Sequence, residues 1–216
     1  MNTFTEENYL KAIYHLSSKT ESVGTNEIAA ALNTKAASVT DMLKKLAEKK
    51  LINYARYQGV TLTTAGEKVA LSIIRKHRLW EYFLVEKLNF KWDEVHDVAE
   101  ELEHISSKEL VDRLDDFMGN PKYDPHGDPI PDKQGKFKAH ELKPVSSLEV
   151  NKEGIISGVR DHSAAFLQYL EKMSLTIGKK IKIADINTYD HSVIIQAGDK
   201  RVHVSREVAN NLLIAL

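Results

Sequence analysis

The sequence predicts a mainly α-helical chain with smaller β elements: three N-terminal helices with a hairpin, a helical middle and a C-terminal β-barrel. Apolar residues recur with helical spacing through the first half of the chain. A turn signal at Gln58-Gly59 lies between two short β-like runs. From about residue 141 the pattern changes to short β-rich runs. We therefore place three domains at residues 1–64, 65–140 and 141–216.

The first domain contains three amphipathic helices followed by two short strands. Thr25 is the predicted N-cap of the second helix. In order, the predicted elements are helices at about 5–18, 25–32 and 36–49 and strands at 51–54 and 60–62. Helix, helix, short turn, helix and small hairpin is the order of a winged helix-turn-helix.

The middle domain is predicted from its helix caps and breakers. Capping boxes begin at Thr64 and Ser106, and Asp93 is a candidate cap between them. The helices predicted from these signals run from about 65 to 88, 94 to 105 and 107 to 118. Four of the five prolines lie between Pro121 and Pro131, which predicts a loop, and the polar stretch 132–144 is typical of a linker.

The last domain is predicted to be a small β-barrel with one inserted helix. The apolar β-rich runs lie at 155–156, 181–183 and 193–195, with a hairpin at Gly198-Asp199 and a helix from Ala164 to Met173. About 70 residues of short strands suit a small barrel.

Composition limits the class of protein. The 216 residues contain no cysteine, which excludes disulfides and thiolate metal sites and fits a cytoplasmic protein. No apolar run approaches 18 residues, and the N-terminus has no basic or apolar leader pattern, so we expect no membrane span and no signal peptide. The net charge of −1 is uneven: residues 1–75 carry ten Lys and Arg against seven Asp and Glu, whereas residues 76–140 carry ten against fifteen. This distribution indicates that the basic residues 1–75 bind a polyanion and that the acidic residues 76–140 bind a cation.

The third helix and the hairpin have the composition of a DNA-reading surface. Residues 35–58 hold six Lys and Arg against Asp41 and Glu48, the surplus that phosphate neutralisation needs. Small and hydroxyl side chains at the start of the helix suit close approach to base edges. We assign DNA contacts to Lys35, Ala37, Ser38, Thr40, Asp41, Lys44, Lys45 and Arg56. The alternatives are a helical core with a solvated lysine face, or a protein-docking module.

The helix predicted at 94–105 has the composition of a metal site. His96, Glu100, Glu103 and His104 are spaced so that all four lie on one helical face. The preceding helix adds His77 and Glu81, one turn apart. Two antiparallel helices would present these imidazoles and carboxylates to a divalent cation. The alternative is a solvated surface with scattered histidines.

The donor types rank the metals. All candidates offer oxygen or imidazole nitrogen, which favours Mn²⁺ or Fe²⁺ over a structural Zn²⁺ site. Zn²⁺ still has high intrinsic affinity, so geometry would have to select against it. We expect Mn²⁺, with Fe²⁺ as the alternative and Zn²⁺, Co²⁺ and Cd²⁺ as substitutes in vitro.

Several blocks of the sequence together resemble the diphtheria-toxin-repressor / manganese-transport-regulator family. These blocks are Glu7 to Tyr14, Lys76 to Glu81, Val95 to Asp97 with Glu103 to Ile105, and Pro125 to Pro131. The resemblance covers the whole chain. It implies a homodimer with an N-terminal winged helix, a helical dimerisation and metal domain, and an SH3-like (FeoA-like) C-terminal barrel. It further implies metal-activated repression from palindromic operator DNA, usually of metal-uptake genes.

The resemblance also implies ligand positions. Asn8, Glu100, Glu103 and His104 match the family's primary or regulatory site, and His77, Glu81 and His96 match the second site. The resemblance also implies a further ligand from the barrel, at Asp161 or His162. It implies another from the proline-rich loop, at Asp124 or His126.

Three positions depart from the family's pattern. The family usually has Asp or Met at position 8, where this chain has the neutral amide of Asn8. Lys11 stands where members of the manganese branch that lack the barrel often have a Glu, and it cannot ligate a metal. Glu100 replaces the Cys of many iron sensors, which favours manganese.

The resulting hypothesis is a switch in which metal links the first helix, through Asn8, to helices 65–88 and 94–105. This would fix two reading heads one DNA turn apart. One alternative is a carboxylate/histidine metalloenzyme, but a di-iron bundle needs Glu-x-x-His from each of two helices and the basic third helix would have no role. The other is a regulator that senses a different ligand and uses metal only structurally.

Overall fold

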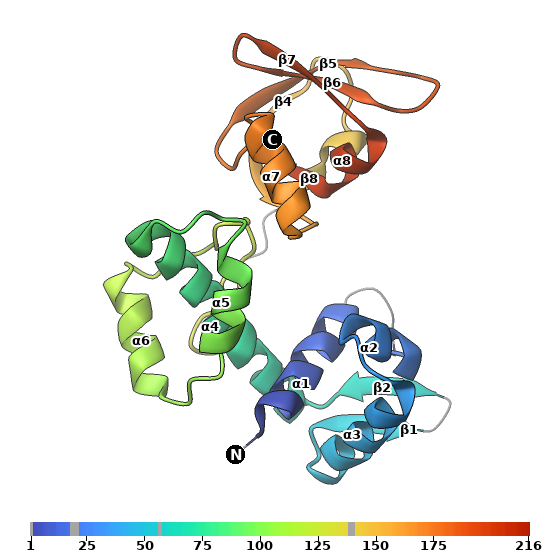
Figure 1. Cartoon of the computed structure of the whole chain (residues 1–216), viewed down its shortest axis with the longest axis vertical. Coiled ribbons are helices and arrows are strands. Elements are labelled where there is room, and N and C mark those ends of the chain that lie inside the picture. Colours follow the sequence, from blue (N-terminus) through green and yellow to red (C-terminus); the bar gives the residue numbers. More distant parts are fainter. Residues whose placement is uncertain (1, 18–21, 56–57, 138–140) are drawn as a thin grey trace. The chain divides into compact units, whose positions relative to one another are not determined.

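The computed structural model describes residues 2–17, 22–55, 58–137 and 141–216. The contacts within the chain divide it into two compact units. The first contains residues 1–77, 101–112 and 131–136, and the second contains 78–100, 113–130 and 137–216. Figure 1 labels the helices and strands in chain order. Among the described residues, no helix is long and apolar enough to span a membrane.

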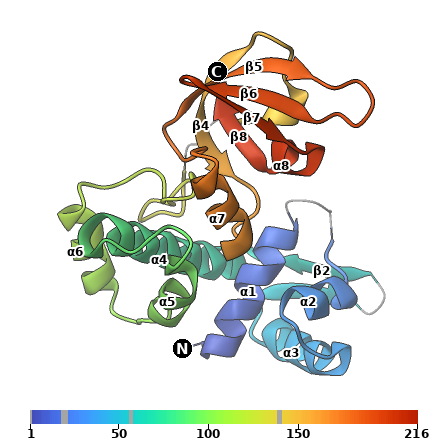
Figure 2. The ribbon, with the colours of Figure 1, turned by 45° about the horizontal axis from the view of Figure 1, so that its top comes forward.

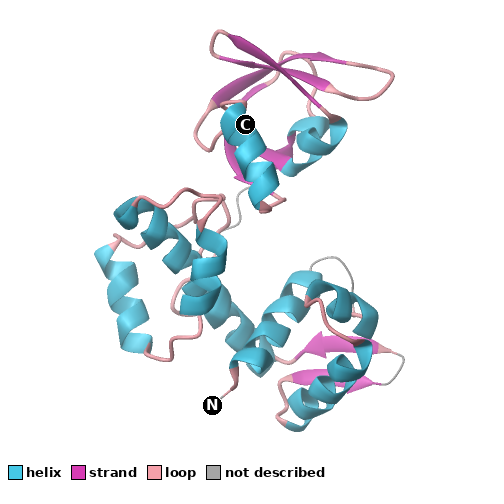
Figure 3. Ribbon diagram, in the orientation of Figure 1, coloured by secondary structure: helices cyan, strands magenta, loops and turns pink. Residues whose placement is uncertain are grey.

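Three helices and a hairpin form the N-terminal part, as predicted (Figure 3). They are α1 (Phe4–Ser17), α2 (Thr25–Ala31), α3 (Ala36–Glu48), β1 (Ile52–Ala55) and β2 (Gly59–Leu62). The two strands pair antiparallel from Ile52↔Leu62 to Ala55↔Gly59. Val39, Leu43 and Leu46 line the buried side of α3 and pack against Leu10 and Ile28. One face of α3 is thereby committed to the core, and the opposite face is left outside.

The N-cap residues of the second helix, α2, and of the following helix, α4, each lie one residue before the predicted position. Gly24, not Thr25, is the N-cap of α2, and its backbone N–H donates to Glu27 at 2.6 Å. Thr63, not Thr64, caps α4, because its hydroxyl accepts from Gly66 N at 3.1 Å. A Cβ on Gly66 would lie 1.9 Å from the Leu51 carbonyl oxygen, so close packing of α4 on the hairpin requires glycine here.

The helical middle consists of α4 (Thr64–Leu88), α5 (Val95–Leu102) and α6 (Lys108–Phe117). Ser107 caps α6 by accepting from Leu110 N at 3.2 Å. Helix α5 is shorter than the predicted helix 94–105. It begins at Val95, and the Asp93 side chain accepts a hydrogen bond from Gln168 of the barrel. The chain leaves the helix at Leu102, so Glu103 and His104 lie in the following turn.

The C-terminal part is a six-stranded antiparallel sheet with the strand order β3-β8-β4-β5-β6-β7, and its buried side chains form one core. Figure 2 shows strands β4 to β8 of this curled sheet. Its strands are β3 (Lys143–Pro144), β4 (Glu153–Val159), β5 (Lys180–Ile186), β6 (Val193–Ala197), β7 (Lys200–Val204) and β8 (Leu212–Ala215). Three helical segments accompany them: η1 (Val145–Ser147), α7 (Ala164–Lys172) and α8 (Arg206–Asn211). The predicted barrel, its hairpin and its inserted helix are confirmed, whereas β3, α8 and β8 were not predicted.

The loop between α6 and the barrel contains an isolated antiparallel bridge, Tyr123↔Pro129. Its Gly127 has φ +88°, and an added Cβ would meet the Ser157 carbonyl oxygen of β4 at 2.0 Å. The His126 carbonyl also accepts from Val159 N at 3.1 Å. Backbone contacts therefore hold this loop directly on β4, which fixes the residues on either side of Gly127.

Candidate functional site

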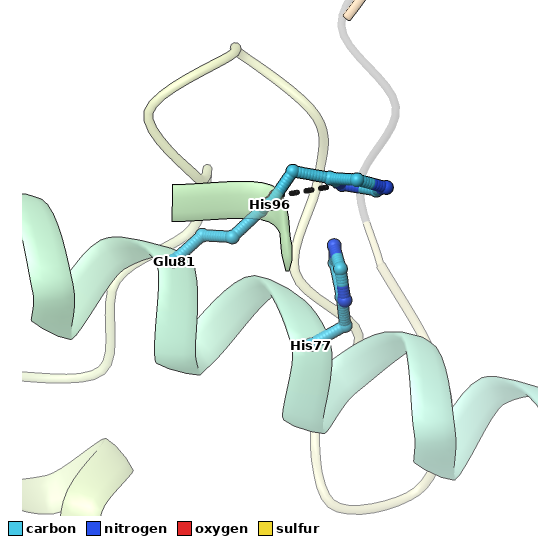
Figure 4. A group of neighbouring side chains, drawn as sticks. All are labelled: His77, Glu81 and His96. Carbon is cyan, nitrogen blue, oxygen red and sulfur yellow. Dashed lines mark ion pairs between the residues drawn. The ribbon is translucent and has the colours of Figure 1, made fainter. Parts of the chain in front are cut away.

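Helix α4 carries His77 and Glu81 one turn apart, and α5 carries His96 (Figure 4). Each offers a ligand atom, and these atoms lie within 4.8 Å of one another. His96 Nδ1 lies 3.5 Å from Glu81 Oε1, and its Nε2 lies 3.6 Å from Glu100 Oε1. The helical spacing that predicted His77, Glu81 and His96 thus brings two imidazoles and a carboxylate within reach of one cation.

A second group, formed by Glu81, Asp124 and His126, is entirely buried, and its ligand atoms also lie within 4.8 Å of one another. Glu81 belongs to both groups. His126 Nδ1 lies 3.6 Å from Glu81 Oε2 and has no hydrogen-bond partner among the described residues. An unpaired buried nitrogen facing a carboxylate suits a metal ligand.

The other nitrogen of His126 has a fixed role. Nε2 donates to the Trp92 carbonyl oxygen at 2.7 Å. When the ring is neutral, this bond places the proton on Nε2 and leaves the Nδ1 lone pair facing Glu81. Burial alone would lower the pKa of His126, but the nearby carboxylates of Glu81 and Asp124 outweigh it and raise that pKa to about 9.

The turn from Asp124 to Asp128 orients the second carboxylate. Asp124 Oδ1 accepts from the backbone N–H groups of His126 and Asp128, both at 2.9 Å. Its Oδ2 lies 3.6 Å from Arg78 Nε. Burial, with the charges of Glu81 and Asp128, raises the pKa of Asp124 to about 7. The metal-free cluster therefore holds protons that a bound cation would displace.

Of the two candidate ligands from the barrel, Asp161 and His162, only His162 lies against the group of Glu81, Asp124 and His126. The His162 ring stacks on His126, with ring centroids 4.9 Å apart, and its Nε2 donates to the Val159 carbonyl at 3.3 Å. Burial lowers the pKa of His162, which favours the neutral ring. The Asp161 carboxylate instead accepts from Ser163 N at 2.8 Å and closes a turn. Of the two alternatives, the geometry favours His162.

The predicted face of Glu100, Glu103 and His104 is divided, because α5 ends at Leu102. None of these three belongs to either group of potential ligands found among the described residues. Glu103 is fully buried and binds Lys11 and His77, whereas His104 Nδ1 donates to Glu7 Oε2 at 2.7 Å. The link from the first helix to this turn therefore runs through Lys11 and Glu7.

Asn8 stays a candidate ligand of a weaker kind. Its Oδ1 is buried and accepts no hydrogen bond from any described residue. From the sequence, Glu7 and Arg78 were recognised only as parts of the family-like blocks and received no role in the site, and Lys11 was treated only as a residue that cannot ligate. No periodicity pairs α1 with a turn some 90 residues later, so the sequence carried no signal for the Lys11–Glu103 contact.

The outer face of α3 is the candidate nucleic-acid interface. Lys35, its N-cap, and most of the predicted contact residues are exposed. These exposed residues are Lys35, Ala37, Ser38, Asp41, Lys44 and Lys45. Thr40 is half-buried and donates to the Ala36 carbonyl at 3.0 Å, while Lys44 pairs with Asp41 at 3.2 Å. Arg56 lies outside the described residues. The assignment of base and phosphate contacts stays a prediction.

The fold and these groups define a class: a winged helix-turn-helix protein with a carboxylate and imidazole cluster beside a small barrel. Three family models match the chain in sequence. They are the N-terminal DNA-binding domain of iron-dependent repressors at residues 1–60, their metal-binding and dimerisation domain at 63–132, and the FeoA domain at 143–216. The predicted domain limits at 64/65 and 140/141 stay predictions.

Individual relatives agree with these matches. The iron-dependent repressor IdeR of Mycobacterium leprae is 34% identical over 127 residues, which are 59% of this chain and 55% of IdeR, so the match spans little more than half of that relative. The regulator MntR of Oceanobacillus iheyensis is 32% identical over 118 residues, 55% of this chain and 80% of MntR.

A solved structure titled manganese-dependent transcriptional repressor in complex with manganese matches with a TM-score of 0.87 at 30% identity, covering 97% of this chain and 98% of that one. The chain belongs to the iron-dependent repressor family of metal-dependent transcriptional regulators.

Proposed function

We propose that this protein is a Mn²⁺-activated transcriptional repressor that binds palindromic operator DNA as a homodimer and controls genes of metal-ion uptake. The observation that carries the proposal is the buried group of Glu81, Asp124 and His126. Buried ionisable groups are costly unless they are paired or bind a cation. The pKa values of Asp124 and His126 are both raised, so these groups keep protons that a metal ligand must lose. Such perturbed pKa values are typical of functional sites.

The donor set supports Mn²⁺ as the metal. Glu81 and Asp124 supply carboxylate oxygens, His126 supplies Nδ1, and the chain contains no cysteine. His77 and His96 add imidazoles next to Glu81. Oxygen with imidazole suits Mn²⁺ and Fe²⁺. The manganese complex of the solved relative favours Mn²⁺, and the name of the mycobacterial relative keeps Fe²⁺ as the alternative.

The cluster joins three segments of the second unit. Glu81 comes from α4, Asp124 and His126 come from the proline-rich loop, and His162 comes from the barrel. A cation held by these groups would stabilise one arrangement of the segments over others. Metal at a hundred times its dissociation constant biases such an equilibrium by about 2.7 kcal/mol. This bias is sufficient for a transcriptional switch.

The exposed face of α3 supports the DNA-binding half of the proposal. It offers Lys35, Lys44 and Lys45 for phosphates, with Ala37 and Ser38 at the start of the helix for base edges. Two such helices in a homodimer would meet half-sites about one DNA turn apart. A palindromic operator follows from that two-fold symmetry.

The test is selection from a pool of random-sequence duplex DNA with the full-length protein, in parallel with Mn²⁺ and with a chelator. We expect an inverted repeat to be enriched only in the Mn²⁺ arm. Parallel arms with Fe²⁺, Co²⁺ and Zn²⁺ rank the metals by the enrichment they support. Enrichment of the same motif in the chelator arm would rule out metal activation, and no enrichment in any arm would rule out sequence-specific DNA binding.

The proposal places the protein in the cytoplasm, where the chromosomal DNA of a bacterium or archaeon lies, and gives it no catalytic role. A metalloenzyme is the rival class. An imidazole and carboxylate cluster alone is compatible with either, but the matched DNA-binding domain favours the repressor. Turnover of a substrate that depends on His126 would support the rival.

A further inference from the structure

A second charged cluster lies in the first unit, where α1 meets the turn after α5. Glu103 is at its centre and is fully buried. Both of its carboxylate oxygens accept from the Lys11 ammonium, at 2.7 and 2.8 Å. His77 Nδ1 donates to Oε2 of the same carboxylate at 2.6 Å. The Lys11 ammonium thus contacts both of the oxygens through which Glu103 could bind a metal ion.

Further charges close the cluster. His104 Nδ1 donates to Glu7 Oε2 at 2.7 Å, and its Nε2 lies 3.8 Å from Glu103 Oε1. The His104 ring also stacks on Phe4, with centroids 4.6 Å apart. Lys76 is buried and donates to the Ile105 carbonyl at 3.4 Å; burial lowers its pKa, and the nearby charges of Glu7 and Glu103 partly oppose that shift. The two carboxylates of the cluster therefore face two ammonium groups of the same chain.

This arrangement does not fit a bound metal. Family resemblance places a metal beside Glu103 and His104, but a divalent cation on Glu103 would lie next to the Lys11 ammonium. Like charges at such a distance repel strongly where water is excluded. Lys11 contacts both oxygens of the buried Glu103 carboxylate and His77 donates to one of them, so the negative charge of Glu103 is already compensated from within the chain.

We propose that Lys11 is an internal cation that takes the place of a metal ion in the cluster of Glu7, His77, Glu103 and His104. The brace between α1 and this turn is therefore present without metal, and the chain binds Mn²⁺ only at the cluster of Glu81, Asp124 and His126, so this proposal gives Asn8 no ligand role. Only the statement about where Mn²⁺ binds rests on the proposed function. Lys11 acts as a positioning residue and sets the number of metal ions.

The brace extends to the DNA-reading helix. Glu6, next to Glu7 on α1, is fully buried and accepts from Lys49 at 2.7 Å, with Lys45 of α3 at 3.5 Å. One turn of α1 therefore contacts α3 through Glu6 and the His104 turn through Glu7. An ammonium in this brace makes the orientation of α3 within the first unit independent of metal supply.

The first experiment counts bound Mn²⁺ by equilibrium dialysis and elemental analysis in the wild type, His104→Ala and His126→Ala. We expect the His104→Ala chain to bind as many ions as the wild type and the His126→Ala chain to bind fewer. Loss of an ion on His104→Ala would overturn the inference. If the wild type binds no Mn²⁺, the proposed function fails, and the second experiment still decides the role of Lys11.

The second experiment removes the internal cation. Lys11→Met keeps the length of the side chain without its charge, and we expect this variant to gain one Mn²⁺ per chain and to lose it again on adding His104→Ala. Lys180→Met is the matched control, because Lys180 pairs with Glu153 at 2.8 Å on the exposed barrel surface. A folded Lys11→Met chain with no added ion would contradict the proposal. If Lys11→Met fails to fold, the His104→Ala count decides.

Discussion

His126 combines three constraints on one imidazole. Its Nε2 is committed to the Trp92 carbonyl, its Nδ1 faces Glu81, and its ring stacks on His162. With a folded-state pKa of about 9 against an ordinary 6.5, His126 contributes stability that is complete below pH 6.5 and is lost as the pH rises through about 9. A cation that binds Nδ1 must first displace its proton.

Binding of Mn²⁺ should therefore release protons and strengthen as the pH rises from 6.5 to 9. Asp124, with its pKa raised to about 7, adds to the release in the lower half of this range. Calorimetry in buffers of different ionisation enthalpy measures the number of protons released. We expect about one or more per ion at pH 7. An enthalpy that does not change with the buffer would show that neither group is a ligand.

Gly127 should tolerate no side chain. Its φ of +88° disfavours other residues, and a Cβ would meet the Ser157 carbonyl at 2.0 Å. We expect Gly127→Ala to lower the free energy of unfolding by about 2–4 kcal/mol and to weaken Mn²⁺ binding through the displaced His126. Gly119→Ala is the control, since Gly119 has φ +76° with nothing within 4 Å, and only the backbone cost of about 1 kcal/mol applies. Equal losses in the two variants would contradict the crowding argument.

For individual residues of the site, the sequence predicted some positions from spacing, others only from family resemblance, and some contacts not at all. His77, Glu81 and His96 followed from helical spacing, and the structure brings them together. Asp124 and His126 followed only from family resemblance, because a loop has no periodicity that places its side chains. The partners of Glu103 were missed, because an ion pair between residues 92 apart in sequence depends on tertiary packing.

Among the elements, α1 makes two kinds of contact through adjacent residues. Glu6 faces α3 and Glu7 faces the turn after α5. Burial raises the pKa of Glu6, but the hydrogen bond from Lys49 and the charges of Lys49 and Lys45 outweigh it, so the pKa lies below its usual 4.5. Its contribution to stability is therefore present above pH 4.5 and is lost as the pH falls through the lowered value.

Glu6→Gln should lower the free energy of unfolding by about 1–2 kcal/mol at pH 7, since it removes a charged hydrogen bond from a buried site. The difference from the wild type should shrink as the pH falls below 4.5, where Glu6 becomes protonated. Urea unfolding across pH 3–7 measures this. Glu153→Gln, which breaks an exposed pair with Lys180, should have little effect. A loss from Glu6→Gln that is the same at pH 3 and pH 7 would contradict the ionic origin.

The elements themselves were mostly predictable, because apolar periodicity identifies a helix or strand that buries one face. Helix α5 ends earlier than predicted, at Leu102. The next residue, Glu103, binds Lys11 and His77, and these tertiary contacts are not encoded in the helical spacing of the sequence. Helix α8 and strand β8 were missed because Leu212 follows α8 directly, with no turn residue to separate them.

For the whole molecule, DNA affinity should depend on α3 and on salt. Replacing an exposed lysine that contacts phosphate reduces affinity for all sequences and lowers the salt slope by about one. Lys44→Ala is the test, because Lys44 is exposed on α3, and Lys180→Ala on the barrel is the control. Fluorescence anisotropy across 50–200 mM salt gives the slope. An unchanged slope for Lys44→Ala would remove this residue from the interface.

The central claim is that a metal bound at Glu81, Asp124 and His126 activates operator binding. The most direct measurement is the affinity of full-length protein for its selected operator, with Mn²⁺ and with chelator, in the wild type and in Glu81→Gln. We predict that Mn²⁺ strengthens wild-type binding about a hundredfold, the ratio that about 2.7 kcal/mol represents. Glu81→Gln should bind at the chelated level under both conditions. Equal wild-type affinity with and without Mn²⁺, or a full Mn²⁺ response in Glu81→Gln, would contradict the account.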